Sequence, residues 1–213
     1  DYNYSWALDN TKYSSISTYL YHNFDRSKIS IDFSYSQEID PKIYLGSRDN
    51  NNPETYNKRY IFGEIRQKTF STSLRINYAI SPDFTFESYF APYFTNGKYL
   101  SFGEALNRKN YALKVYGKYS GTSIEENENY YKIADGNDEF NIGKQDFYFK
   151  SFRSSVVIRW EFLPGSQLYL VWQVKDSRYD KYQKIMLDDF SDLLGRKARH
   201  SFMMKISYWF ANV

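Results

Sequence analysis

The chain has 213 residues, with 28 Lys and Arg against 25 Asp and Glu, so its formal net charge of +3 gives no reason to expect nucleic acid or an anionic surface as a partner. It has no cysteine, which excludes a disulfide framework, a CxxC metal site and a thiol nucleophile, and no run of 18 apolar residues that could form a transmembrane helix. Aromatic residues make up 21% of the chain although its mean hydropathy is negative, a combination that suits strands with one apolar and one polar side.

Alternation of apolar and polar residues, the pattern of a strand with two different sides, recurs along the whole chain. Eight segments show it, in chain order 2–8, 13–24, 29–36, 70–80, 84–94, 152–162, 167–175 and 200–210. The two sides differ least in residues 13–24 and most clearly in residues 200–210. The sequence therefore predicts about eight antiparallel strands.

The connections predicted between these segments are of two kinds, short and long. Short connections are expected near residues 9–12, 25–28, 81–83 and 164–165, and long polar ones near 38–66, 97–147 and 178–198. If the strands run up and down, three of the short connections fall at one end and all the long ones at the other. Short periplasmic turns and long extracellular loops are typical of outer-membrane β-barrels. Residues 184–197, in the last long loop, have the spacing of a short amphipathic helix.

The two sides of the strands differ in charge, and in a membrane barrel each side would face a different environment. Its polar sides line the lumen, and its apolar sides face lipid or form aromatic girdles. The residues expected in the lumen are Arg75, Glu87, Arg153, Arg159, Glu161 and Lys205. Those expected against lipid or in a girdle are Phe84, Phe86, Trp160, Trp172, Tyr208 and Phe210. A soluble antiparallel sheet shows the same alternation, so a β-sandwich stays open as an alternative.

Residues with catalytic or metal-binding chemistry are sparse. His22 and His200 are too few for a histidine metal site. His200 and Ser201 are adjacent, so on a strand they point to opposite faces and cannot act as base and nucleophile. Residues 135–139 resemble part of a calcium loop without the full EF-hand pattern, so we expect a solvated loop, with a weak calcium site as the alternative. We assign no catalytic residue, metal or cofactor.

Several blocks of the sequence resemble a known family. They are residues 59–69, 73–78, 151–154, 159–166 and 205–210, of which Arg-Trp-Glu-x-x-Pro-Gly-Ser at 159–166 is the most specific. Over roughly residues 59–210 the chain is similar to the C-terminal module of large Gram-negative outer-membrane proteins known as domain of unknown function 5916. Members of that family carry an N-terminal domain similar to family-nine carbohydrate-binding modules, followed by a predicted barrel. The resemblance implies location and fold, and no binding residue is carried over from the N-terminal domain.

We therefore expect residues 1–213 to form one all-β domain in a bacterial outer membrane. It is an antiparallel transmembrane β-barrel of about eight strands, complete or the C-terminal part of a larger barrel, with long extracellular loops and one short loop helix. The expected function is a scaffold, surface-binding or channel-like component linked to glycan handling. Expected partners are outer-membrane lipid and other outer-membrane proteins or surface glycans, and not nucleic acid.

Two alternatives remain from the sequence. The first is a hydrolase acting on glycans, with its active groups in the loops or in an N-terminal domain outside this chain. Glu87 and Glu161 are its carboxylate candidates within the strands, and their separation decides whether they fit such a mechanism. The second is a soluble periplasmic β-sandwich that acts as a binding module.

Overall fold

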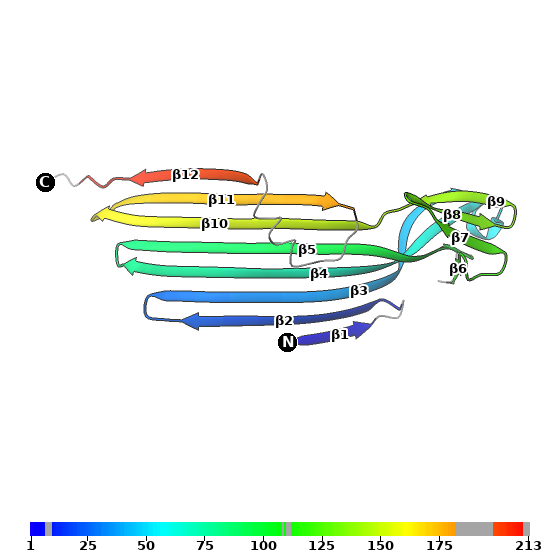
Figure 1. Ribbon diagram of the computed structural model, residues 1–213, viewed down its shortest axis with the longest axis horizontal. Coiled ribbons are helices and arrows are strands. Elements are labelled where there is room, and N and C mark those ends of the chain that lie inside the picture. The colour runs from blue at the N-terminus through cyan, green and yellow to red at the C-terminus, as the bar shows by residue number, and fades with distance from the viewer. Residues whose placement is uncertain (7–9, 108, 110–111, 182–197, 211–213) are drawn as a thin grey trace.

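The chain folds into a long antiparallel sheet with a smaller sheet at one end (Figure 1). The computed structural model describes residues 1–6, 10–107, 109, 112–181 and 198–210. The expected all-β, antiparallel class is confirmed. Within these residues, no helix is both long and apolar enough to span a membrane.

The long sheet is an up-and-down arrangement in which sequence neighbours pair, apart from one step from β5 to β10. Its strands in spatial order are β1 (Tyr2–Trp6), β2 (Lys12–Asn23), β3 (Ser27–Asp49), β4 (Lys58–Ser81), β5 (Phe84–Ala105), β10 (Phe147–Leu163), β11 (Ser166–Asp180) and β12 (Arg199–Ser207). The short β6 (Leu113–Val115) pairs with the end of β5. The smaller sheet consists of β7 (Thr122–Glu126), β8 (Tyr130–Asp135) and β9 (Asp138–Gly143).

Tight turns join the long strands at one end of the sheet, on the left in Figure 1. They connect β2 to β3, β4 to β5, and β10 to β11, which confirms the short connections predicted near residues 25–28, 81–83 and 164–165. The last turn places Gly165 at φ 78°, a left-handed conformation that glycine adopts without steric cost. At this end of the sheet, the strands therefore end close to where the sequence placed them.

The outer edges of the long sheet are β1 and β12. In the described part of the chain no ladder joins these two strands, so the sheet is open. The eight-strand path agrees with the number predicted, but the structure does not contain the closed barrel that the sequence analysis expected. A closed barrel is therefore a proposal and not an observation.

The far ends of β3, β4 and β5 continue into a compact region, which we call the lobe, together with β6 and the smaller sheet (Figure 1). β3 and β4 contain 23 and 24 residues, whereas a membrane strand needs only about 9–11. Their connection is residues 50–57, with a 3-10 helix η1 (Pro53–Thr55). β3 and β4 are thus more than twice that length, and their far ends form part of the lobe.

The long loops predicted at 38–66 and 97–147 are wrong in extent, because most of these residues lie in strands. β-Bulges explain the error. β3 is irregular between Asp40 and Ile43 and between Tyr44 and Gly46, and β5 has an extra residue, Leu100, opposite the step from Glu64 to Ile65 of β4. A bulge inserts one residue and so breaks the two-residue alternation on which the prediction depends. The helix expected at 184–197 lies outside the described residues.

The lobe has the kind of core that a soluble domain has. Its buried side chains are Ile65, Tyr99, Phe102, Tyr116, Tyr131, Ile133, Phe140 and Ile142. Gly97 lies opposite Phe147 at the base of this core, and a Cβ at position 97 would lie 2.3 Å from the Phe147 ring. A glycine here therefore lets that ring pack against the neighbouring backbone.

Candidate functional site: the two faces of the long sheet

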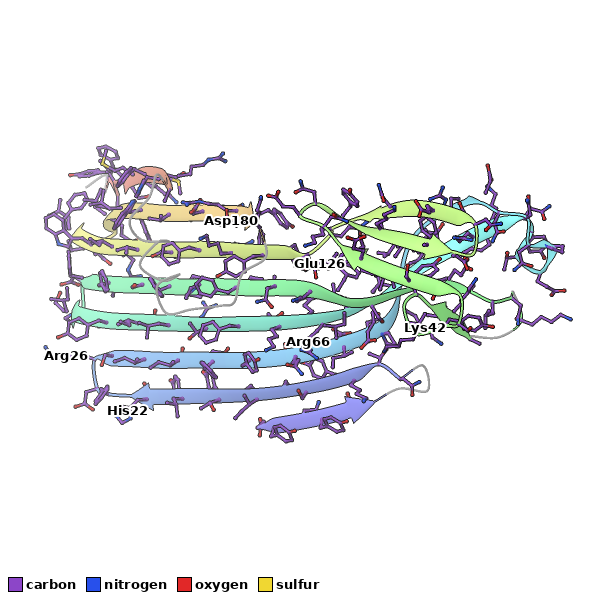
Figure 2. All side chains as sticks on the ribbon, turned by 45° about the vertical axis from the view of Figure 1, so that its right-hand side comes forward. His22, Arg26, Lys42, Arg66, Glu126 and Asp180 are labelled. Atoms are coloured by element: carbon purple, nitrogen blue, oxygen red, sulfur yellow. The ribbon has the colours of Figure 1, made fainter. Side chains whose placement is uncertain are left out.

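One face of the long sheet, which we call the apolar face, carries no Asp, Glu, Lys or Arg among its described residues from the turns as far as Phe90 and Ser154, and nearer the lobe it carries Lys150, Asp176 and Arg178. Directly paired residues of neighbouring strands share a face. One row across this face reads Ile29, Ile76, Ser88, Val156, Trp172 and Phe202, and the next reads Tyr78, Phe86, Ile158, Leu170 and Met204. Figure 2 shows Arg26 at the turn end, and Arg66 and Asp180 toward the lobe, on either side of this zone.

The apolar face is open over much of its area. Leu170 and Ile206 are 39% and 60% exposed, and Phe202 is also exposed. Toward the lobe the face becomes buried around Phe94 and Phe152. In a β-sandwich a second sheet would cover the centre at about 10 Å. Among the described residues, the smaller sheet packs instead on the far ends of β4 and β5, within the lobe.

Aromatic side chains gather at both ends of the apolar face, with aliphatic ones between them. Toward the turns, ring centroids are 5.9 Å apart for Trp160–Phe162, 6.4 Å for Phe162–Tyr208 and 4.6 Å for Tyr208–Phe210. Toward the lobe they are 5.2 Å apart for Phe33–Phe70, 6.0 Å for Phe70–Phe94 and 4.8 Å for Phe90–Phe152. Along β10, the distance from Phe152 to Trp160 is about 26 Å at the usual rise per residue.

The opposite face, which we call the polar face, holds all six charged residues predicted for a lumen. Their directly paired neighbours establish the shared face: Arg75 pairs with Tyr89, Glu87 with Val157, Arg153 with Ala91, Arg159 with Thr85, Glu161 with Gln167 and Lys205 with Tyr169. The Arg75 guanidinium lies 4.4 Å from the centre of the Tyr89 ring, and the Lys205 ammonium 5.8 Å from that of Tyr169. Whether this face lines a lumen stays a prediction.

The six residues predicted to face lipid or form a girdle lie on the apolar face. Phe84 pairs with Trp160, and Phe86 and Trp172 lie in the apolar rows. Tyr208 and Phe210 follow β12, and their rings continue the aromatic series that begins at Trp160. The two predicted sets thus occupy opposite faces, while contact with lipid remains a prediction.

The carboxylates considered for glycoside hydrolysis are far apart. Glu87 lies directly opposite Val157, four residues along β10 from Glu161, which is about 13 Å at the usual rise per residue. Paired carboxyl groups in inverting glycosidases lie about 6.5–9.5 Å apart. Glu161 also accepts a hydrogen bond from the backbone N–H of Gly165 at 2.9 Å, which holds it to the turn. This pair therefore does not support a hydrolase within the sheet.

The histidines and the calcium-like stretch have structural partners. The Trp172 indole N–H donates to His200 Nδ1 at 3.2 Å, on the face opposite Ser201. Asp135 and Asp138 flank the tight turn between β8 and β9, and Asp135 binds Lys114 at 2.6 Å. The stretch is thus a hairpin rather than the solvated loop expected. Within the described ranges, no group of three or more potential ligands could hold a metal ion.

A buried ionic cluster joins the strands of the lobe. Arg59 Nε lies 2.6 Å from a Glu104 oxygen, Arg59 Nη2 lies 2.9 Å from Asp135, and Arg59 Nη1 lies 3.4 Å from Asp138. Lys114 Nζ lies 2.6 Å from Asp135 and 3.4 Å from Glu104. Sequence reasoning missed this cluster, because its members come from five strands and carry no local pattern.

Two tyrosines in the core of the lobe keep their protons more firmly than usual. The Tyr116 hydroxyl donates to Glu104 at 3.3 Å, and burial together with that carboxylate raises the pKa of Tyr116. Burial, assisted by Asp146 and Glu126, raises the pKa of Tyr131 to about 12. Each raised pKa means that the folded lobe favours the neutral phenol.

We therefore expect the lobe to lose stability in alkali. Because these tyrosines have a raised pKa in the folded chain, their contribution is complete below about pH 10 and declines as the pH rises toward the folded value. Near-UV circular dichroism between pH 8 and 12.5 should report this loss. Tyr131→Phe should move the alkaline midpoint upward, whereas the same change at exposed Tyr130 should leave it in place. A midpoint that Tyr131→Phe does not move would contradict the expectation.

Comparison with known proteins gives one match. A family model described as Domain of unknown function (DUF5916) matches residues 2–211, nearly the whole chain and more than the 59–210 expected from the sequence blocks. No curated protein and no solved structure matches the chain.

Proposed function

The chain belongs to the family described as Domain of unknown function (DUF5916), and we propose that its long sheet is the wall of an outer-membrane β-barrel. The apolar face contacts lipid and the polar face encloses an aqueous interior. The protein acts there as a non-enzymatic scaffold, surface-binding or channel-like component. The observation that carries the proposal is an exposed zone of the apolar face that crosses six strands without Asp, Glu, Lys or Arg, from the tight turns to the level of Phe90.

The size of the apolar face supports lipid as its neighbour. The largest apolar patch on a soluble monomer is typically about 300–600 Å². Here apolar rows cross six strands, and neighbouring strands lie about 4.8 Å apart. Outer-membrane barrels present an apolar band about 25 Å tall with aromatic girdles at both borders. The aromatic groups near Trp160 and near Phe70, with aliphatic residues between them, match this arrangement.

The two ends of the sheet suggest an orientation in the membrane. Outer-membrane barrels have short turns on the periplasmic side and long connections outside the cell. The turns before β3, β5 and β11 then face the periplasm, and the lobe lies at the cell surface. The lobe's conventional core and ionic cluster suit contact with water.

The open edges also favour completion of the barrel in lipid. Unpaired backbone groups at a sheet edge cost several kcal/mol each in hydrocarbon, so only closed sheets span membranes. Eight strands can close into a barrel whose interior is filled by side chains. The proposal is therefore that β1 and β12 are joined, directly or through further strands.

Quenching by brominated lipid tests the proposal. Two single-tryptophan proteins are compared: one keeps Trp172 on the apolar face, and the other carries Val171→Trp on the polar face. After folding into vesicles with bromine near the bilayer centre, we expect strong quenching of Trp172 and weak quenching at 171. Equal quenching at both positions, or none at Trp172, would rule out the assignment of the two faces.

A further inference from the structure

Three cationic side chains lie side by side on the polar face. Arg153 of β10 is directly opposite Lys175 of β11, and Lys175 is directly opposite Arg199 of β12. All three residues are exposed. Directly opposite side chains have Cβ atoms about 4.5–5.5 Å apart, and like charges in this position destabilise a sheet. The row therefore destabilises the sheet, and the fold itself does not explain why it is there.

Nothing nearby in the described residues neutralises this row. The neighbours two positions along the three strands are neutral hydrogen-bonding side chains: Ser151, Ser155, Gln173, Ser177 and Ser201. Asp176 follows Lys175 but points to the other face, where it pairs with Arg178. Asp32 lies three strands from Arg153, about 14 Å at the usual strand spacing. Among the described residues, no ion pair engages any of the three cations.

A groove of about 590 Å³ runs beside the row, and aromatic rings line it. Tyr89, Tyr93 and Phe149 line it together with Arg153 and Lys175, and its lining also includes Asp32 and Asp176. The centroids of the Tyr93 and Phe149 rings are 6.1 Å apart, and those of Phe149 and Tyr179 are 4.7 Å apart. Tyr179 is 77% exposed, which leaves a large ring available for contact.

We propose that this part of the polar face binds an acidic oligosaccharide. The row of Arg153, Lys175 and Arg199 binds successive carboxylate groups, because cations without protein partners keep their full attraction for an anion. The apolar faces of the sugar rings pack on Tyr93, Phe149 and Tyr179, whose rings offer both apolar area and a polar hydroxyl. Serine and glutamine beside the row bind sugar hydroxyls. The inference names a ligand class for the proposed polar face, and needs only that water reaches that face.

Binding of oligogalacturonate to the whole chain, folded in detergent, tests the inference by titration calorimetry at low salt. We expect measurable binding that weakens as salt increases. Lys175→Gln should lower the affinity about tenfold or more, since a hydrogen bond to a charged group contributes that much. The same variant should melt at an unchanged or higher temperature, because it removes repulsion. Lys28→Gln, at an exposed lysine of the same face on β3, is the matched control and should bind normally.

The remaining probes test whether binding requires both the negative charges and the sugar rings. An uncharged glucose oligomer and inorganic phosphate should each bind far more weakly, and Tyr179→Ala should weaken only the sugar. Equal binding of the uncharged oligomer, equal binding of phosphate, or a Lys175→Gln variant that binds like the wild type would each overturn the inference. A chain whose Trp172 is quenched in lipid but which does not bind oligogalacturonate overturns this inference alone, and leaves the barrel proposal standing.

Discussion

Val156→Lys is expected to prevent folding of the sheet into lipid, whereas Val157→Lys, one residue later, is expected to be tolerated. Val156 lies on the apolar face between Ser88 and Trp172, midway between the aromatic borders of β10. Lysine at the bilayer midplane on the lipid side of a barrel costs about 2–4 kcal/mol. Val157 is on the polar face directly opposite Glu87, where an added ammonium group stays in water and meets a carboxylate.

The pair is informative because the two substitutions share residue type, strand and depth. Urea unfolding in vesicles would measure the free energy, and mobility with and without heating in detergent gels would measure the folded fraction. Equal destabilisation by the two lysines would contradict a lipid-facing side. If the unmodified chain folds in water without lipid or detergent, and Val156→Lys alone unfolds it there, the soluble β-sandwich is the better explanation.

The long strands were predictable because their two sides differ in polarity. Residues 70–80 and 152–162 alternate without interruption, and each corresponds to a regular ladder in the structure. Two of the tight turns were predictable from Pro-Gly and Ser-Pro-Asp chemistry. By contrast, β7, β8 and β9 have at most six residues each, and their alternation is too short to stand out from a loop.

The cationic row was not predictable, because one bulge decides which residues meet. Leu163 pairs with Ser166 at the turn, but the register of β10 and β11 shifts between Glu161 and Leu163. A ladder continued from the turn without that shift would place Arg153 opposite Asp176, an ordinary cross-strand ion pair. The observed register places it opposite Lys175 instead. Sequence alternation assigned Arg153 to the polar face, but it does not specify the partner across a bulge.

Glu104→Gln is expected to destabilise the lobe strongly while leaving the rest of the long sheet intact. Arg59 and Glu104 are 5% and 6% exposed, and the two groups lie 2.6 Å apart. Removing one partner of a buried ion pair costs about 3–5 kcal/mol, and we expect the lower end of that range here, because Asp135 and Asp138 still lie beside Arg59. The Arg59 guanidinium also lies 4.7 Å from the centre of the Phe140 ring, so its displacement would disturb the packing between β4 and β9.

Amide hydrogen exchange in the full chain would measure the effect, since the backbone hydrogen bonds of β8 and β9 report opening of the lobe. Glu126→Gln provides the control, because its pair with Lys144 is largely exposed and such pairs contribute at most about 1 kcal/mol. Faster exchange in β8 and β9 with Glu104→Gln, and unchanged exchange in β10 and β11, would show a lobe that opens independently of the wall. If Glu104→Gln and Glu126→Gln had equally small effects, the cluster would contribute no more to stability than a surface ion pair. Uniformly faster exchange through every strand would mean that the lobe and the wall unfold together, which would contradict an anchored sheet carrying a separate surface region.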